Sequence, residues 1–145
     1  MKLDHVCIAV RKIDFARDKI CAMLGYEPRT AKVTNTRQEV VVQFLRKPGS
    51  IDLKLIEPSN PNSPLVDFVK KGGGLHHLCF QAEDGKQAIA ELCDKGARLI
   101  TQQQPGEAFG DHLIAFLFLG FGLNVEIIDT DERHQELVPN ETDES

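Results

Sequence analysis

The sequence predicts an α+β fold in which two copies of a strand–helix–three-strand (βαβββ) module form one cup-shaped sheet. The first observation is a repeat: LDHVCIAV, at Leu3–Val10, matches LHHLCFQA, at Leu75–Ala82, at an offset of 72 residues. The same offset aligns IDLKLIE with LNVEIID. The second observation is periodicity, because each half contains one segment of helical period among segments that alternate with period two. Two related modules are therefore expected, at residues 1–57 and 74–129.

The first module begins with a strand and a helix. Residues of Lys2–Val10 alternate between two faces, and His5 and Cys7 share one of them. Ile13–Leu24 carries an apolar stripe at helical spacing and is followed by Gly25, a residue favoured after a helix end. The KPGS turn predicts a hairpin between the last two strands. The three strands that follow the helix are expected at Glu27–Val33, Glu39–Arg46 and Ile51–Glu57.

A polar linker, residues 58–73, separates the modules. Ser63 followed by Pro64 is typical of a helix start and predicts a short helix over Pro64–Lys71. Residues 130–145 are acidic and poor in apolar side chains, so they are expected to form a disordered tail. The second module repeats the pattern of the first, with a strand at Leu75–Ala82, a helix at Gly85–Lys95, and strands at Arg98–Thr101, His112–Phe118 and Asn124–Asp129.

Composition limits the class of protein. At 145 residues, with 41% hydrophobic and 27% charged residues, the chain is expected to be one globular domain. The net charge of −5 and the pI near 5.5 argue against a nucleic-acid partner. No apolar run approaches the roughly 20 residues of a membrane span, and the start does not read as a signal peptide, so a cytoplasmic location is expected.

The four cysteines lie inside strand or helix patterns. Free cysteine often behaves as a small core residue, so reduced structural thiols are expected rather than disulfides. A reactive Cys7 or Cys79 is the alternative.

The repeat brings chemically active side chains to one face of each half-sheet. If helices cover the other faces, His5, His77 and Glu126 meet near the floor of the cup. Two imidazoles and one carboxylate suit a catalytic divalent metal, although an ordinary core or surface histidine is the alternative for each. Alternation places His76 on the helix face, which favours His77 as the ligand. The substrate-contacting residues expected around this site are Cys7, Gln43, Cys79, Phe118 and Phe121.

These stretches resemble the vicinal oxygen chelate superfamily, which includes glyoxalase I, methylmalonyl-CoA epimerase, drug-resistance proteins such as those against bleomycin and fosfomycin, and extradiol dioxygenases. The resemblance is strongest to the epimerase branch and covers about Lys2–Asp129. It is carried by LDHVCIAV, by LIEPSNPNSPLVDFVKKGGGLHHLCFQ and by the final VEII. The resemblance implies a divalent metal (Zn, Ni, Co, Mn or Fe), a small carbonyl or acyl-thioester substrate, isomerase or lyase chemistry, and a homodimer.

The ligand set implied by the resemblance departs from the family at one position. The four ligands fall on His5, Lys54, His77 and Glu126, and the second is glutamine or glutamate in relatives. An ammonium group has no lone pair for a metal. Lys54 could turn away and leave a three-residue triad, lose its proton and act as a base, or replace the metal by pairing with Glu126. Lys54 and Glu126 are therefore the expected catalytic residues.

Two further departures affect the reaction. The catalytic glutamate of the epimerase branch falls on Val42, and the polar turn of relatives is replaced by FLGFGLN, which suits an apolar ligand, a subunit contact or core packing. Three functions stay open. The favoured one is a glyoxalase- or epimerase-like metalloenzyme that uses metal-assisted proton transfer. The alternatives are a three-ligand metal-dependent oxygenase and a metal-free binding protein for a drug or metabolite.

Overall fold

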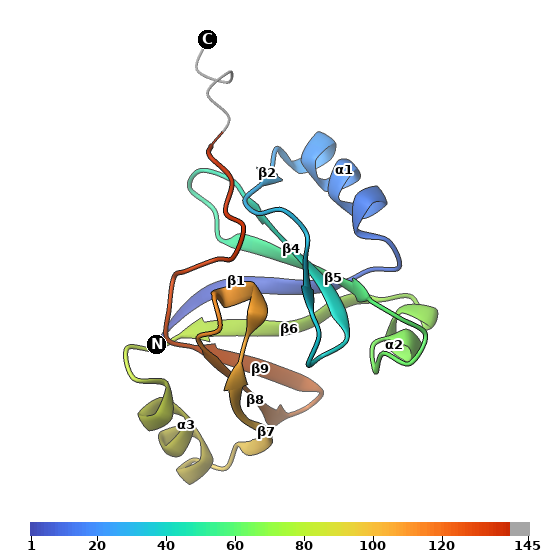
Figure 1. The fold of residues 1–145 in the computed structure, drawn as a ribbon. Coiled ribbons are helices and arrows are strands. Elements are labelled where there is room, and N and C mark those ends of the chain that lie inside the picture. Colours follow the sequence, from blue (N-terminus) through green and yellow to red (C-terminus); the bar gives the residue numbers. More distant parts are fainter. Residues whose placement is uncertain (140–145) are drawn as a thin grey trace.

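The computed structural model describes residues 1–139, which form one mixed sheet of nine strands with three α-helices (Figure 1). The strand order is β2-β4-β5-β1-β6-β9-β8-β7, and β3 pairs with β4. Each half of this order contains one module, so the predicted α+β fold with two βαβββ modules is confirmed. None of the described helices has the length and apolar character needed to cross a membrane.

The first module follows the predicted element order with one difference. The single strand expected over Glu27–Val33 is two short strands, because the chain between them leaves β4 and pairs with C-terminal residues. The backbone N–H of Arg29 donates to Phe44 (2.8 Å), but that of Ala31 donates to Gln135 (3.0 Å). The elements are β1 (Lys2–Ala9), α1 (Ile13–Leu24), β2 (Glu27–Pro28), β3 (Val33–Asn35), β4 (Val40–Arg46) and β5 (Asp52–Pro58).

The second module has a longer seventh strand than expected. This strand continues to Pro105, which pairs with Leu113, and a short 3-10 turn (η1, Glu107–Phe109) follows it. The linker contains α2 (Val66–Lys70). The other elements are β6 (Gly74–Gln81), α3 (Gly85–Asp94), β7 (Arg98–Pro105), β8 (Leu113–Gly120) and β9 (Leu123–Ile128).

The two modules meet at β1 and β6, which pair antiparallel at the centre of the sheet. Each of these strands also has a parallel partner from its own module, β5 for β1 and β9 for β6. The four central strands therefore come from corresponding positions of the repeat. Helix α1 lies beside the first module and α3 beside the second (Figure 1).

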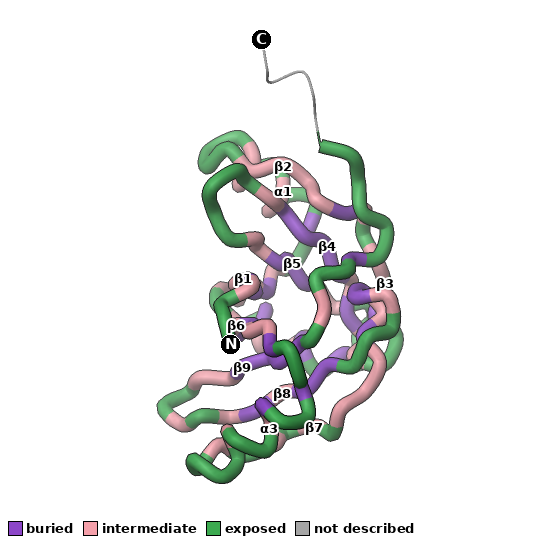
Figure 2. Tube along the Cα trace, turned by 90° about the vertical axis from the view of Figure 1, so that its left-hand side faces the viewer, coloured by how far each residue is buried: buried purple, intermediate pink, exposed green. Residues whose placement is uncertain are grey.

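Buried side chains separate into a cup side and a helix side. Apolar residues of β1, β4 and β5 pack with α1 around Ile13, and residues of β6, β8 and β9 pack with α3 around Ala88. The opposite faces of these strands enclose a third cluster that contains Cys7, Cys79 and Phe109. Figure 2 shows the buried residues running along the strands at the centre of the molecule. The expected covering of one sheet face by helices is thus present, and the other face forms the cup.

The segment after β9 lies against the fold, which corrects the expected disorder of this part of the 130–145 tail. The His134 N–H donates to the carbonyl of Ala108 (2.9 Å) and the Leu137 N–H to that of Arg29 (2.8 Å). Arg133 is 4% exposed. The remainder of the predicted tail, residues 140–145, lies outside the described residues. A polar composition did not reveal these bonds, because they join backbone groups to elements distant in sequence.

Candidate functional site

Four side chains from the four central strands converge where the modules meet. His5 comes from β1, Lys54 from β5, His77 from β6 and Glu126 from β9. None of the four residues, taken whole, is more than 2% exposed. The register explains the convergence, since Cys7 of β1 lies opposite both Lys54 and His77. The sequence repeat therefore predicted correctly which residues the fold brings together.

Glu126 is at the centre of this four-residue cluster. Its Oε1 lies 3.3 Å from Nε2 of His5 and 3.3 Å from Nε2 of His77. The Lys54 ammonium lies 3.4 Å from both Oε1 and Oε2 of the same carboxylate. One buried carboxylate therefore contacts two imidazoles and one cation.

Lys54 and Glu126 form a buried ion pair. Burial by itself lowers the pKa of Lys54, but the interactions of the ammonium with its neighbours, of which the Glu126 carboxylate is the strongest, together outweigh burial, and the net pKa is raised. Burial likewise opposes ionisation of Glu126, yet the charge of Lys54 holds its pKa well below the usual value. The ammonium also lies 5.3 Å from the ring centroid of Phe109 and 5.9 Å from that of Phe44. The raised pKa of Lys54 and the lowered pKa of Glu126 favour the charged form of both groups. They give no support to the use of Lys54 as a base.

His5 presents an unpaired nitrogen to the cup. Its Nδ1 lies 2.7 Å from Asp4 Oδ2, and because a carboxylate only accepts, Nδ1 carries the proton. In the neutral imidazole, Nε2 is the acceptor nitrogen. It is buried without a hydrogen-bond partner, since its 3.3 Å contact with Glu126 does not have hydrogen-bond geometry. Arg133 donates to the same Asp4 oxygen and so helps to fix the orientation of His5.

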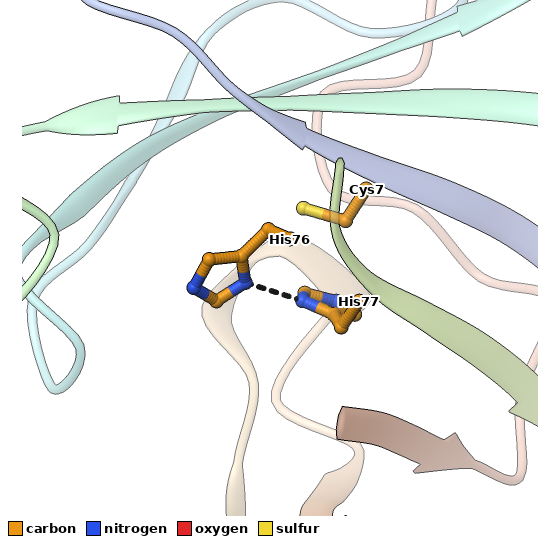
Figure 3. A group of neighbouring side chains, drawn as sticks. All are labelled: Cys7, His76 and His77. Carbon is orange, nitrogen blue, oxygen red and sulfur yellow. Dashed lines mark hydrogen bonds between the residues drawn. The ribbon is translucent and has the colours of Figure 1, made fainter. Parts of the chain in front are cut away.

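His76 points to the cup side, which corrects its expected position on the helix face. Cys7 pairs with His77 but Ile8 pairs with Leu75, so His76 is an extra residue in a β-bulge. Its Nδ1 lies 2.8 Å from Nδ1 of His77, next to Cys7 (Figure 3). Burial lowers the pKa of His77 to about 4, so this imidazole is neutral at pH 7.

The two cup-side cysteines are buried neutral thiols. Burial raises the pKa of Cys7 to about 12, and it raises that of Cys79 well above the ordinary value. Neither group is therefore poised as a thiolate nucleophile. Both line the cup as expected, and their contact with a substrate stays a prediction.

Gln43 lies on the opposite face of β4 from the cluster, which corrects its expected place in the cup. Phe44 pairs with Lys54 and Gln43 with Leu55, and directly paired residues share a face. The Gln43 amide donates to the Thr30 carbonyl (2.9 Å) and accepts from Arg17 (3.2 Å). Phe44 takes the cup position that was expected for Gln43.

The two phenylalanines of the FLGFGLN loop are outside the four-residue cluster. Phe121 is 87% exposed in the turn between β8 and β9. Phe118 is half-buried, with the Arg98 guanidinium 5.5 Å from its ring centroid. The aromatic residue of β8 that does contact the cluster is Phe116, whose ring centroid lies 5.1 Å from that of His77. Strand alternation alone, with the correct register, would have identified Phe116.

A cover of aromatic and cationic side chains closes the cup. The Arg133 guanidinium lies 4.6 Å from the ring centroid of Phe44 and 4.9 Å from that of Phe109. Two cavities, of about 800 and 390 Å³, lie elsewhere, and neither is lined by a member of the four-residue cluster. Besides Phe116, sequence reasoning missed four neighbours of the cluster, and among these only Asp4, which is adjacent to His5, gave any signal. The four are Asp4, Phe44, Phe109 and Arg133.

The donor atoms near the cup can be compared with those a divalent metal needs. The three candidate donors His5, His77 and Glu126 lie within 4.8 Å of one another, and the unpaired His5 nitrogen suits a metal ligand. Lys54 does not suit it, because a cation at about 4 Å repels a divalent ion by about 8 kcal/mol at an effective dielectric constant of about 20. That repulsion is comparable with the whole binding free energy of many zinc sites. The cluster with Lys54 in place therefore does not fit a divalent metal.

Two other groups of candidate donors occur in the described residues. Each shares a histidine with the first group and adds a buried cysteine. A neutral thiol with a raised pKa is a poor ligand until it loses its proton. These two groups are Cys7 with His76 and His77, and Asp4 with His5 and Cys79.

Known proteins share both the sequence pattern and the fold. Residues 4–116 match the Glyoxalase/Bleomycin resistance protein/Dioxygenase superfamily. An ethylmalonyl-CoA/methylmalonyl-CoA epimerase of Cereibacter sphaeroides is 32% identical over 120 residues, which cover 81% of this chain and 87% of the relative. An uncharacterised Bacillus subtilis protein is 36% identical over 117 residues, 80% of this chain and 81% of the relative. The crystal structure of methylmalonyl-CoA epimerase from Mycobacterium tuberculosis has a TM-score of 0.78 at 27% identity, covering 88% and 86% of the two chains.

Proposed function

The chain belongs to the glyoxalase/bleomycin resistance protein/dioxygenase superfamily, and we propose that it is an epimerase-type isomerase acting on an acyl-CoA. The reaction is transfer of the proton on the carbon next to the thioester carbonyl. Similarity to epimerases of methylmalonyl-CoA and ethylmalonyl-CoA supports this reaction and this class of small-molecule substrate. The substrate we expect is an acyl-CoA with a substituent at that carbon.

The proposal is carried by one observation: the unpaired Nε2 of His5 and the Lys54 ammonium both contact Oε1 of Glu126, at 3.3 and 3.4 Å. Removal of a proton next to a carbonyl needs a base for the proton and a positive group for the oxygen that becomes negative. His5 Nε2 supplies the lone pair, and Lys54 supplies the positive charge, in a site from which water is excluded. Asp4 is a positioning residue, because its bond to Nδ1 keeps the lone pair on Nε2.

We assign the base to His5 because β4 has no carboxylate at the position where the resemblance implies one. The resemblance implies a glutamate at position 42, but Val42 is 1% exposed and packs in the cup core. His5 is the described side chain of the cluster that has both an unpaired nitrogen and a fixed tautomer. Metal-assisted proton transfer, the form expected from sequence, requires Lys54 to leave Glu126, so we propose the reaction without a metal step.

The substrate reaches this site only when the cover moves. Phe109, in η1, and Arg133, in the segment after β9, are the parts of the cover that do not belong to the sheet. The segment is held to η1 by the backbone bond from His134 to Ala108 and to Asp4 through Arg133. Two further backbone bonds, from Ala31 to Gln135 and from Leu137 to Arg29, hold it to the chain after β2. We expect an acyl thioester to enter by displacing this segment while the sheet keeps the four-residue cluster in position.

The proposal is tested by following deuterium uptake at the α-carbon of methylmalonyl-CoA and ethylmalonyl-CoA in D₂O by proton NMR. We expect protein-dependent exchange that falls by about 100-fold or more in His5→Gln, the usual contribution of a general base. His112→Gln is the matched control, because this exposed histidine pairs with Glu132 outside the cluster. Folded protein without exchange on either thioester would contradict the proposal.

A metal-free binding protein is the second candidate function. Position 42 carries valine instead of a carboxylate, and the cup is closed, which both suit a binding protein. The oxygenase is disfavoured because it would need the metal that Lys54 repels. Saturable binding of an acyl-CoA, measured by calorimetry, together with no deuterium exchange would support this candidate instead.

A further inference from the structure

Lys54 occupies the position that mirrors Glu126 across the join of the modules. The two residues are 72 positions apart, the same offset that relates His5 to His77. In a symmetrical site these positions would carry like groups, but here one is a cation and the other an anion. The cluster therefore contains one positive and one negative group, besides two imidazoles.

The Lys54 ammonium is held firmly at this position. It contacts both oxygens of Glu126 at 3.4 Å, and the rings of Phe44 and Phe109 lie within 6 Å of it. Its side chain is 3% exposed. Moving it away would leave the Glu126 carboxylate buried without a cation, which is strongly unfavourable. The three candidate metal donors, His5, His77 and Glu126, therefore already have a cation of the chain beside them.

We infer that the Lys54 ammonium is a built-in cation that takes the place of a divalent metal in this site and polarises the substrate carbonyl. The exclusion of metal rests on the geometry of the cluster alone. The catalytic part rests on the proposed function. The two parts can fail separately, because metal binding and proton exchange are measured separately.

The catalytic step needs no other reactant. The C–H bond next to the carbonyl breaks, its proton goes to Nε2 of His5, and its electron pair forms the carbon–carbon double bond of the enolate. The carbonyl oxygen gains the negative charge and accepts a hydrogen bond from the Lys54 ammonium. Nε2 of His5 then returns its proton to the same carbon, on either face of the planar enolate, which restores the thioester and the free base, so protons and electrons balance.

Metal content is the first test. Wild-type protein, purified and then dialysed with Co²⁺ or Zn²⁺, is analysed by plasma mass spectrometry and by the visible spectrum of bound Co²⁺. We expect much less than one equivalent of metal and no d–d bands. One equivalent of metal in the wild type that is lost in His77→Ala would overturn the inference, and this measurement needs no Lys54 variant.

Substitution of Lys54 is the second test. Lys54→Gln removes the charge and adds a neutral oxygen donor, so we expect Co²⁺ to bind at least about 100-fold more tightly than to the wild type. Lys54→Met removes the charge without adding a donor and should give weaker binding than Lys54→Gln but tighter than the wild type. Folded variants, checked by circular dichroism, that bind no more metal than the wild type would contradict the role of the ammonium.

The dependence of catalysis on metal is the third test. Deuterium exchange by the wild type should be unchanged after chelator treatment and should not increase when Co²⁺, Ni²⁺ or Zn²⁺ is added. Activity that requires an added metal would overturn the catalytic part of the inference. Absence of exchange under every condition would reject the proposed function, and the metal-binding results would still decide whether Lys54 replaces the metal.

Discussion

Lys54 and Glu126 carry opposite charges in a part of the protein from which water is excluded. Loss of one partner of such a pair costs more free energy than replacement of both, because the remaining charge is buried alone. We expect Lys54→Met to lower the free energy of unfolding by about 3–5 kcal/mol, measured by urea denaturation. The double variant Lys54→Met, Glu126→Leu should recover most of this loss. A double variant as unstable as the single one would show that the ion pair is not the cause.

His77 makes the stability depend on pH. Its folded pKa of about 4 is lower than its ordinary 6.5, so between these values the unfolded chain binds more protons. Stability is therefore lost as the pH falls, by about 2 kcal/mol between pH 7 and pH 5. The pKa of Glu126 is also lowered, which acts in the same direction, but most of that loss of stability occurs below its ordinary pKa of 4.5 and therefore below this window.

Urea denaturation of His77→Gln at the same two pH values is the control for this prediction. Burial also lowers the pKa of His76, so the variant should lose only part of the pH dependence. If His77→Gln keeps the full pH dependence of the wild type, the effect arises elsewhere.

Individual site residues were predictable to different degrees. The repeat predicted His5, Lys54, His77 and Glu126, because corresponding strands of two modules place their residues at corresponding points. The ion pair was one of three possibilities for Lys54, since a sequence does not determine where a flexible side chain ends. The contact of Arg133 with Asp4 joins residues more than 120 positions apart and had no local signal.

At the scale of the element, two predictions, the faces of Gln43 and of His76, were wrong because of strand register. In β4, a shift of one residue exchanges the two faces, and Phe44 rather than Gln43 lies beside Lys54. In β6, the bulge at His76 turns this residue to the side of His77. Period-two alternation identifies a strand. It does not show which face of the strand lies in the core or where a β-bulge inserts an extra residue.

The turn that leads into β6 depends on Gly73. Its φ is 68°, in the left-handed region, and a β-carbon there would lie 2.5 Å from the carbonyl oxygen of Ala9. We expect Gly73→Ala to lower the free energy of unfolding by about 2–4 kcal/mol, through backbone strain and the clash with β1. Thermal and urea denaturation would measure this change.

Gly49 is the matched control for Gly73. Its φ is 75°, but no atom lies within 4 Å of the added β-carbon. Gly49→Ala should therefore cost only the conformational strain, about 1 kcal/mol. Equal losses in the two variants would show that the contact with Ala9 is unimportant.

The whole molecule combines a predictable sheet with an unpredicted cover. The order of the strands follows from the repeat, because each module needs the other to enclose the cup. The cover is formed by η1 and the segment after β9, which have no counterpart in the first module and no apolar pattern. The homodimer and the cytoplasmic location expected from the sequence stay predictions.

Arg133 connects this cover to the four-residue cluster. Its removal would uncover the rings of Phe44 and Phe109 and leave Asp4 without its cation. We expect Arg133→Ala to lower the free energy of unfolding by about 2–4 kcal/mol and to increase binding of a hydrophobic dye. Arg98→Ala is the control, because the exposed Arg98 contacts only the ring of Phe118 among the aromatic side chains described, and its loss should cost no more than about 1 kcal/mol. Equal effects of the two substitutions would contradict the role of Arg133.

Metal-independent proton exchange tests the central claim most directly. Chelator-treated wild-type protein is incubated with methylmalonyl-CoA and with ethylmalonyl-CoA in D₂O, and the α-proton signal is followed by NMR. We predict that deuterium enters at a rate that added metal does not raise and that His5→Gln largely abolishes. Exchange that appears only after a divalent metal is restored, or no exchange from folded protein on either substrate, would contradict the account.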